Sequence, residues 1–374
     1  MPSRSRIFYF AAGFFLILYV ITSATSRHDV AGWMLTLFFS LIALAFREHP
    51  ILKGYSFTVM IFAAVSAAMY HPQYFIQVGS FKLSKLIVPL MQIIMFGMGT
   101  GLSIGDFSRV ARMPKGVVLG VCCQYLIMPF VGLLLTKIFN FPNEVAAGII
   151  LIGCCPSGLA SNVMTYLARA NLALSVTITA IATLMAPLVT PFLMSQLAGQ
   201  YVEINFWAMV WDITKIVIIP VSAGLLFNYV LHGKFKQLDA IMPIISMAGI
   251  VLIIVVITSA GRNDLLVVGP KLIMVVILHN STGYFLGYWS ARLLRMDERD
   301  SRTIAIEVGL QNAGLGSSLA LAMGKLSTVG LAAAIFAPVM NITGSSLALW
   351  WRGRPIKDTT EYDQAEPIKL KTDR

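Results

Sequence analysis

An acidic side chain and two amides lie together in an apolar segment near the C-terminal end of the chain. The segment reads TIAIEVGLQNAGLGSSLALAMG over residues 303–324, and it contains Glu307, Gln311 and Asn312. Glu307 and Gln311 are four residues apart, so they share one face of a helix. A carboxylate at membrane depth costs about 2.5–3.5 kcal/mol on insertion scales and therefore marks a functional site. Such a group can hold a cation or exchange a proton.

A second apolar segment also combines polar residues with helix breakers. It reads GCCPSGLASNVMTYL over residues 153–167, with Pro156 and Gly158 at its centre and Ser161 and Asn162 after them. Proline removes a backbone donor, and lipid offers no partner for the groups that are freed. We therefore expect broken helices near residues 156–160 and 308–314. Two broken helices at corresponding positions indicate a transporter binding site.

The composition requires lipid as the surrounding solvent. Hydrophobic residues make up 57% of the chain and charged residues 12%, whereas soluble domains carry about 25% charged residues. The mean hydropathy is +0.78. The net charge of +11 does not indicate nucleic acid binding, because Lys and Arg gather in the cytoplasmic loops of membrane proteins. The pairs Cys122-Cys123 and Cys154-Cys155 lie in apolar runs, so we expect reduced thiols, and no spacing predicts a bound cofactor.

The apolar runs predict about twelve membrane helices, since each crossing needs about 20 residues. The expected spans are roughly 7–24, 30–46, 55–70, 83–103, 116–138, 144–168, 171–197, 206–230, 240–260, 269–292, 300–323 and 326–351. The predicted fold is an all-α, polytopic membrane protein.

The expected spans divide into four regions. Residues 1–54 hold two extra N-terminal transmembrane helices, residues 55–197 and 206–351 hold five helices each, and residues 352–374 form a disordered cytoplasmic tail. Each predicted break falls in the fourth helix of its half. Because five is odd, the halves insert with opposite topology. The prediction is thus a ten-helix core of two inverted repeats, each with one broken helix.

The charged loops predict the orientation. With the N-terminus in the cytoplasm, the inner loops hold more Lys and Arg than the outer loops, including Arg47, Arg169 and Arg352. The positive-inside rule then places both termini in the cytoplasm. We expect a multi-pass protein of a bacterial inner membrane.

These segments closely resemble the bile acid/sodium symporter family, in its bacterial or plastid-type branch. The resemblance rests on GCCPSGLASNVMTYLARANLALSVTITAIATLMAPLVTP and IEVGLQNAGLGSSLA, with MQIIMFGMGTGLS and ILHNSTGYFLGYW, and it extends from about Ser56 to Trp351. It implies a core domain from the third to fifth helices of each half and a panel domain from the first two. It also implies that the two broken helices cross in the core, next to two sodium sites. The implied function is not enzymatic. It is sodium-coupled symport, by alternating access, of a bile-acid-like anion or a small carboxylate such as pyruvate or pantoate.

The resemblance also assigns sodium ligands, residue by residue. The first site would be Ser161, Asn162, Ser175, Thr179 and Glu307, and the second Gln124, Glu307, Gln311 and the carbonyls of Val308 and Leu310. Hard cations prefer such oxygen ligands. One carboxylate shared by two sodium ions leaves one positive charge, which a monovalent anion would neutralise.

The anion is expected near the crossing, where half-helix N-termini present N–H groups and a positive dipole end. The substrate-binding candidates are Ser157, Gly158, Leu159, Asn312 and Asn341. A common family pattern has Gly and Thr at the positions of Ser157 and Leu159. This departure leaves the identity of the anion open.

Two alternatives compete with the sodium symporter. A proton-coupled organic acid carrier of the same fold would use Glu307 as its proton site, but it would not need the other oxygen ligands. An enzyme with Cys154 or Cys155 as nucleophile would need a base. The mid-span His279 has no visible acidic partner, so His279 and Asn280 are expected to form interhelical hydrogen bonds. The expected partners are the lipid bilayer, sodium ions and an organic anion, without nucleic acid.

Overall fold

Helices form nearly all of the described part of the chain, because a segment in lipid must pair its backbone groups internally. The computed structural model describes residues 3–49, 52–103, 105–106, 112–231, 236–354 and 356. Within this part, nine helices are long and apolar enough to cross a membrane, and three shorter apolar helices accompany them. The prediction of an all-α, polytopic membrane protein is confirmed. Most of the predicted tail, residues 355 and 357–374, lies outside the described residues.

The helices follow the expected spans closely. In chain order they are α1 (Ser3–Ala24), α2 (His28–Arg47), α3 (Ser56–Tyr70), α5 (Ile87–Thr100), α7 (Pro114–Phe139), α8 (Asn143–Cys154), α9 (Leu159–Leu167), α10 (Leu172–Ala198), α11 (Phe206–Ile213), α12 (Ile219–Leu231), α13 (Lys236–Ala260), α14 (Arg262–Leu293), α15 (Glu298–Gly309), α16 (Ala313–Ala322) and α17 (Gly330–Arg352). A π-helical turn, Thr214–Ile218, joins α11 to α12.

Two spans are broken where the sequence predicts breaks. The first span consists of α8 and α9, which leave residues 155–158 between them. The second consists of α15 and α16, separated by residues 310–312. Both breaks are confirmed. Each predicted half therefore contains its broken span in the expected place, while the relation of the halves as inverted repeats stays a prediction.

A small β-hairpin between α3 and α5 was not predicted. A short helix, α4 (Gln73–Ile76), leads into β1 (Gln77–Val78), which pairs antiparallel with β2 (Phe81–Lys82). Gly79 turns the chain with a φ of +60°. Strands of two residues are too short to produce an alternating pattern, so the sequence carries no signal for them.

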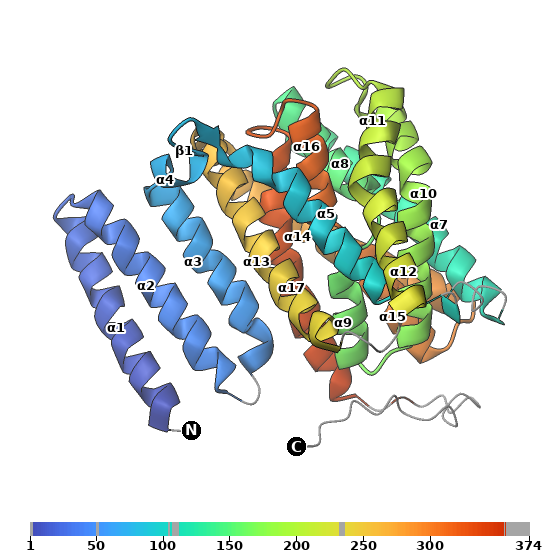
Figure 1. Ribbon diagram of the computed structural model, residues 1–374, viewed down its shortest axis with the longest axis horizontal. Coiled ribbons are helices and arrows are strands. Elements are labelled where there is room, and N and C mark those ends of the chain that lie inside the picture. The colour runs from blue at the N-terminus through green and yellow to red at the C-terminus, as the bar shows by residue number, and fades with distance from the viewer. Residues whose placement is uncertain are drawn as a thin grey trace.

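The two extra helices form a hairpin at one edge of the bundle (Figure 1). Their main contacts outside the hairpin are with α3. The Tyr19 and Tyr70 hydroxyl groups lie 3.2 Å apart, and the Trp33 ring stacks on His71 at 4.4 Å between centroids. The hairpin therefore packs against α3, the first helix of the first half, and takes no part in the region where the broken helices meet.

Close backbone packing joins two of the helices assigned to the panel. A Cβ added to Gly99 on α5 would lie 2.2 Å from the Val221 carbonyl oxygen, and one added to Gly224 on α12 would lie 2.2 Å from the Phe96 carbonyl oxygen. Both glycines are needed for α5 and α12 to approach this closely. Such small-residue contacts are typical of membrane helix pairs.

The chain begins and ends on one side of the bundle. In Figure 1, α1 begins and α17 ends at the side where α9 and α15 lie, whereas α8 and α16 lie toward the opposite side. We call these the termini side and the far side. The arrangement agrees with an even number of crossings, and the cytoplasmic location of the termini stays a prediction.

Candidate ion and substrate site

The two breaks meet and pair as short antiparallel strands. Ser157 and Gln311 face each other in an isolated β-bridge. The Asn312 N–H donates to the Pro156 carbonyl at 2.9 Å, and the Gly158 N–H donates to the Leu310 carbonyl at 3.3 Å. The unwound backbone thus supplies part of the pairing that lipid cannot. Residues far apart in the sequence are brought together at this crossing.

Side chains from neighbouring helices satisfy the carbonyl groups where α8 and α15 end. The Cys154 carbonyl accepts from Thr190 Oγ1 at 2.7 Å, and the Cys155 carbonyl accepts from Gln124 Nε2 at 2.8 Å. At the other break, the Gly309 carbonyl accepts from Asn280 Nδ2 at 2.8 Å. Helix ends leave such carbonyls without intrahelical donors. This pairing explains several of the polar residues within apolar spans.

Glu307 lies at the centre of a cluster of hydroxyl groups. Its side chain is fully buried. Ser157 Oγ donates to its carboxylate at 2.5 Å, Ser175 Oγ at 2.5 Å and Thr179 Oγ1 at 2.9 Å. Hydrogen bonds of this kind favour the charged form of a buried carboxylate. Within the described part of the chain, Glu307 forms no ion pair, so its charge has hydroxyl partners and no protein cation.

The residues predicted for the first sodium site lie in one cluster. Asn162 Oδ1 is 2.8 Å from Ser175 Oγ, which also contacts Glu307. Ser161 Oγ lies 3.3 Å from Thr179 Oγ1 and donates to the Gly158 carbonyl at 2.8 Å. The cluster draws on α9, α10 and α15, three segments that converge on the crossing. Its hydroxyl, amide and carboxylate oxygens are the donor types that a hard cation takes.

The residues predicted for the second site also lie together, although here they bond to one another. Gln124 Nε2 donates to Gln311 Oε1 at 2.7 Å, and Gln311 Nε2 donates to the Val308 carbonyl at 2.6 Å. The Leu310 carbonyl accepts from the Gly158 N–H. Both glutamines are fully buried. The oxygens of Gln311, Val308 and Leu310 already accept hydrogen bonds from N–H groups, which a sodium ion would have to displace. The assignment of the second site therefore stays a prediction.

Among four of the five substrate-binding candidates, three lie where a half-helix begins and one lies within α17. Gly158 and Leu159 lie where α9 begins. Asn312 caps α16, because its Oδ1 accepts from the Leu315 N–H at 3.0 Å. Asn341, on α17, donates to the carbonyl of Ala337 on its own helix at 2.7 Å. Gly158, Leu159 and Asn312 thus lie at the crossing, and the contact of all four residues with an anion stays a prediction.

Ser157 has a position that the sequence did not reveal. Its hydroxyl points to Glu307 and its backbone pairs with Gln311, while its predicted contact with the substrate stays a prediction. It therefore belongs to the cluster around the carboxylate. The sequence contains no signal for this contact, because Ser157 and Glu307 are 150 residues apart and only the crossing brings them together.

The interhelical hydrogen bonds predicted for His279 and Asn280 are confirmed. His279 Nε2 lies 2.8 Å from the Met128 carbonyl oxygen. Asn280 donates to the Gly309 carbonyl, and its Oδ1 accepts from Thr343 Oγ1 at 2.5 Å. Both residues therefore hold α14 against its neighbours.

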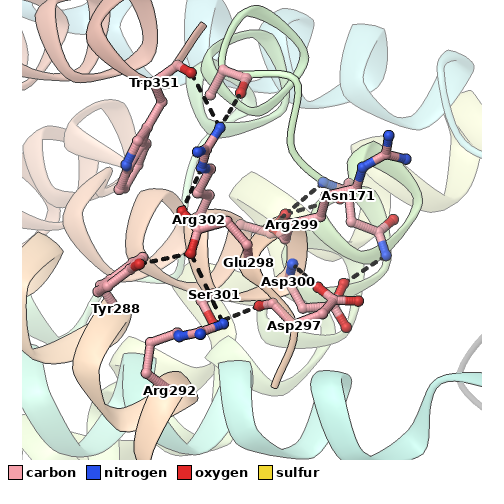
Figure 2. A network of polar contacts seen from close by, with 12 residues as sticks. Asn171, Tyr288, Arg292, Asp297, Glu298, Arg299, Asp300, Ser301, Arg302 and Trp351 are labelled. Carbon is pink, nitrogen blue, oxygen red and sulfur yellow. Dashed lines mark hydrogen bonds and ion pairs between the residues drawn. The ribbon is translucent and has the colours of Figure 1, made fainter. Parts of the chain in front are cut away.

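A buried arginine near the termini side was also unexpected. Arg302 lies near the start of the expected span 300–323, and its side chain is only 2% exposed within α15. Arg302 Nε pairs with Glu298 at 2.8 Å, and its Nη1 donates to the Trp351 carbonyl at 3.1 Å (Figure 2). Tyr288 donates to the other Glu298 oxygen at 2.7 Å. The spacing of Glu298 and Arg302, four residues apart, is the signal that could have indicated this pair.

Comparisons with known proteins agree on one family. A model of the Sodium Bile acid symporter family matches residues 88–267. The chain is 43% identical over 270 residues to the uncharacterized sodium-dependent transporter YocS of Bacillus subtilis (strain 168), covering 72% of this chain and 84% of the relative. It is 36% identical over 307 residues to the probable sodium/metabolite cotransporter BASS1, chloroplastic, of Oryza sativa subsp. japonica, covering 81% and 73%. It is 31% identical over 246 residues to the ileal sodium/bile acid cotransporter of Oryctolagus cuniculus, covering 64% and 70%.

Proposed function

Because the chain belongs to the sodium/bile acid symporter family of sodium-dependent transporters, we propose that it couples sodium movement to the transport of an organic anion by alternating access. It is a multi-pass membrane transporter and not an enzyme. The observation that carries the proposal is the buried Glu307 carboxylate, which three hydroxyl groups surround at the crossing of two broken helices.

The proposed coupling ion is sodium, bound at two sites that share Glu307. Ser161, Asn162, Ser175 and Thr179 complete the first site, and Gln124, Gln311 and the carbonyls of Val308 and Leu310 complete the second. The clustering of these groups supports the proposal. A proton carrier would need Glu307 alone, so the surrounding oxygens favour sodium.

The proposed substrate is an organic anion bound beside the crossing. Two sodium ions and one carboxylate leave one positive charge in a buried place, where it is costly without a counter-ion. The helices α9 and α16 both begin at the crossing, so the positive ends of their dipoles point toward it. A bile-acid-like anion or a small carboxylate would bind there, near the backbone of residues 157–159 and the side chains of Asn312 and Asn341.

Alternating access is supported by an asymmetry between the two second half-helices. On α9, Val163 is 56% exposed and Tyr166 is 60% exposed. The residues at the same places along α16 are Ser317 and Ala320, which are 2% and 0% exposed. The side chains at the crossing are themselves buried, so the asymmetry lies in the half-helices: α16 is enclosed at these places, whereas α9 presents an outer face. We infer a state that opens toward the termini side.

Uptake into vesicles tests the proposal. Purified protein in liposomes would be given bile acids and small carboxylates under a sodium, potassium or choline gradient at constant pH. Concentrative uptake of an acid with sodium, and not with potassium or choline, is the expected result. Equal uptake driven by a proton gradient alone would contradict sodium coupling and favour the proton carrier.

A further inference from the structure

The two broken helices are joined again at each side of the bundle, away from the crossing. The second half-helices α9 and α16 are each followed by a polar residue at the same distance along the chain, Asn171 after Leu159 and Lys325 after Ala313. Each of these residues contacts a carboxylate in the first turn of the other broken helix. We call the two contacts the far-side tie and the termini-side tie.

The far-side tie is an ion pair between the turn after α16 and the start of α8. Lys325 Nζ pairs with Glu144 Oε1, and Thr328 Oγ1 donates to Glu144 Oε2 at 2.5 Å. Glu144 is in the first turn of α8. The side chains of Lys325 and Glu144 are 34% and 38% exposed. The pair therefore connects the end of one broken helix to the beginning of the other while remaining partly in water.

The termini-side tie makes the same connection between the turn after α9 and the start of α15. Asn171 Nδ2 donates to Asp300 Oδ1 at 2.8 Å (Figure 2). The Asn171 N–H donates to Thr303 Oγ1 at 2.9 Å, and Thr303 Oγ1 lies 3.2 Å from the Asn171 carbonyl oxygen. Asp300 is in the first turn of α15. The contact lies beside the Glu298–Arg302 pair, which fixes the same end of α15 to Trp351.

The two broken helices are thus bonded to each other at three places: at the crossing and at the two ties. At the crossing, the broken helices share two backbone hydrogen bonds, from Gly158 and Asn312. The ties join the same four half-helices at their outer ends. The oxygens around Glu307 come from α9, α10, α15 and the first break. A change in the tilt of α8 or α15 therefore moves these oxygens relative to one another.

We propose that Glu144, Lys325, Asn171 and Asp300 are positioning residues, which set the spacing of the cation-binding oxygens at the crossing. This inference rests on the proposed sodium binding. None of the four residues contacts Glu307 in the described structure, so their effect on sodium is transmitted through the half-helices. The expected signature is a change in sodium affinity that conservative or compensating substitutions reverse.

The far-side tie allows a charge-reversal test. The variants are Glu144→Lys, Lys325→Glu and the double variant, each titrated with sodium in purified form by tryptophan fluorescence. Each single variant is expected to raise the half-saturating sodium concentration about two- to fivefold, the range that partly exposed ion pairs support. The double variant restores the pair in reverse and is expected to return to within about twofold of native. Unchanged affinity in both single variants would overturn the role of this tie.

A matched control comes from another partly exposed ion pair. Lys215 and Asp212 lie 2.9 Å apart, with side chains 44% and 26% exposed, and both belong to the α11–α12 segment. This pair joins no half-helices. Asp212→Ala is expected to leave the half-saturating sodium concentration unchanged. An equal shift in Asp212→Ala would assign the effect to surface charge in general and overturn the inference.

The termini-side tie is tested by substitutions that differ in one acceptor. Asp300→Asn keeps an oxygen for Asn171 Nδ2, whereas Asp300→Ala removes it. We expect near-native sodium affinity for Asp300→Asn, which keeps an acceptor, and about fivefold to tenfold weaker affinity for Asp300→Ala, because Asp300→Ala loses the part-buried hydrogen bond from Asn171. The melting temperature is measured in parallel without sodium.

The outcomes separate this inference from the proposed function. If the tie variants lower the melting temperature but the folded protein binds sodium with native affinity, the ties are structural and the inference is wrong. If the native protein itself shows no sodium binding, the proposed function fails and the inference fails with it. A shift in sodium affinity with native maximal uptake at saturating sodium supports both.

Discussion

At the scale of single residues, Glu307 is the group on which the proposed cation binding depends. It is buried, and its described partners are hydroxyl groups that donate hydrogen bonds to it. A carboxylate in this setting attracts a small cation, since the hydroxyl oxygens can also turn their lone pairs toward an ion. The proposed sharing of Glu307 makes the two sodium sites depend on each other, and such coupling is reciprocal.

Replacing Glu307 is therefore expected to weaken both sites together. Glu307→Gln keeps the shape of the side chain and removes the charge. We expect sodium affinity to fall at least tenfold, by the roughly 1.5–3 kcal/mol of a buried interaction with a charged group. Calorimetric sodium titration of the purified variant measures the change. Near-native binding at both sites would show that the ligand assignment is wrong.

Single-site variants supply the comparison for Glu307. Gln124→Ala should weaken the second site and largely spare the first, and Asn162→Ala should do the reverse. In the native protein, anion affinity should rise with sodium concentration, and in Glu307→Gln it should hardly vary. Equal effects of Gln124→Ala and Asn162→Ala on both sites would contradict the division into two sites.

Ser157 gives a prediction that the sequence alone did not suggest. Ser157→Ala removes a hydroxyl 2.5 Å from Glu307, and we expect a loss of sodium affinity of about tenfold or more from one lost hydrogen bond to a charge. Ser318→Ala is the matched control, because the buried Ser318 hydroxyl donates to the Gly314 carbonyl on its own helix. If both variants bind sodium equally well, Ser157 does not belong to the ion site.

Most residues of the candidate site could be predicted from the sequence, but the contacts between them could not. Glu307 and Asn162 stand out because each is polar within an apolar span. Ser175 and Thr179 required the family resemblance, since hydroxyl residues in helices commonly bond to their own backbone. The contact of Ser157 with Glu307 and the burial of Arg302 depend on tertiary packing. No local pattern records such packing.

At the scale of elements, the ends of the half-helices explain why several polar side chains lie within the apolar helices around the crossing. Thr190, Gln124 and Asn280 each donate to a carbonyl that an unbroken helix would have satisfied itself. Membrane helices without such donors would leave these carbonyls unpaired in an apolar interior. The broken elements therefore need support from α7, α10 and α14.

Removing one of these donors is expected to destabilise the fold. Asn280→Ala leaves the Gly309 carbonyl and the Thr343 hydroxyl without Asn280. We expect a loss of about 1–3 kcal/mol in the free energy of unfolding, seen as a lower melting temperature in detergent. Thr136→Val is the control, because the Thr136 hydroxyl bonds to the Leu133 carbonyl within α7. A melting temperature for Asn280→Ala equal to that of the control would contradict this role.

The elements themselves could be predicted well from the sequence. Long apolar runs set the spans, and Pro156 with the polar residues after it set the first break, so both break positions were found. The hairpin β1–β2 and the π-helical turn at Thr214–Ile218 were not found. Both are short departures of the backbone within or beside apolar runs, where periodicity over ten or more residues is insensitive.

At the scale of the whole molecule, the inferred direction of opening rests on the difference between α9, which has an exposed outer face, and the enclosed α16. Val163 and Ser317 occupy the same place along their half-helices, and they are 56% and 2% exposed. Without sodium and substrate, a cysteine at Val163 should react with a membrane-impermeant thiol reagent from the termini side. A cysteine at Ser317 should react much more slowly from either side. The four native cysteines would first be replaced.

The accessibility experiment also tests the sequence-based orientation. Oriented vesicles establish which membrane face the termini side occupies, and tags at the two ends of the chain report it independently. We expect both tags on the cytoplasmic face. We also expect the reagent to reach Val163→Cys from that same face. Tags on opposite faces would contradict the even number of crossings. Faster labelling of Ser317→Cys than of Val163→Cys would contradict the inferred opening.

The solitary Glu307 carboxylate has an electrical consequence. Under the proposed stoichiometry, two sodium ions and a monovalent anion cancel the charge of Glu307, so the loaded crossing is neutral, whereas the empty crossing carries one negative charge. A voltage acts on charge with about 2.3 kcal/mol per 100 mV for each elementary charge moved across the membrane. The potential therefore drives the return of the empty protein and leaves the loaded step unaffected. Net uptake should then generate a current and accelerate with an inside-negative potential. Exchange of internal for external substrate, in which the protein is loaded in both directions, should proceed at the same rate at any voltage.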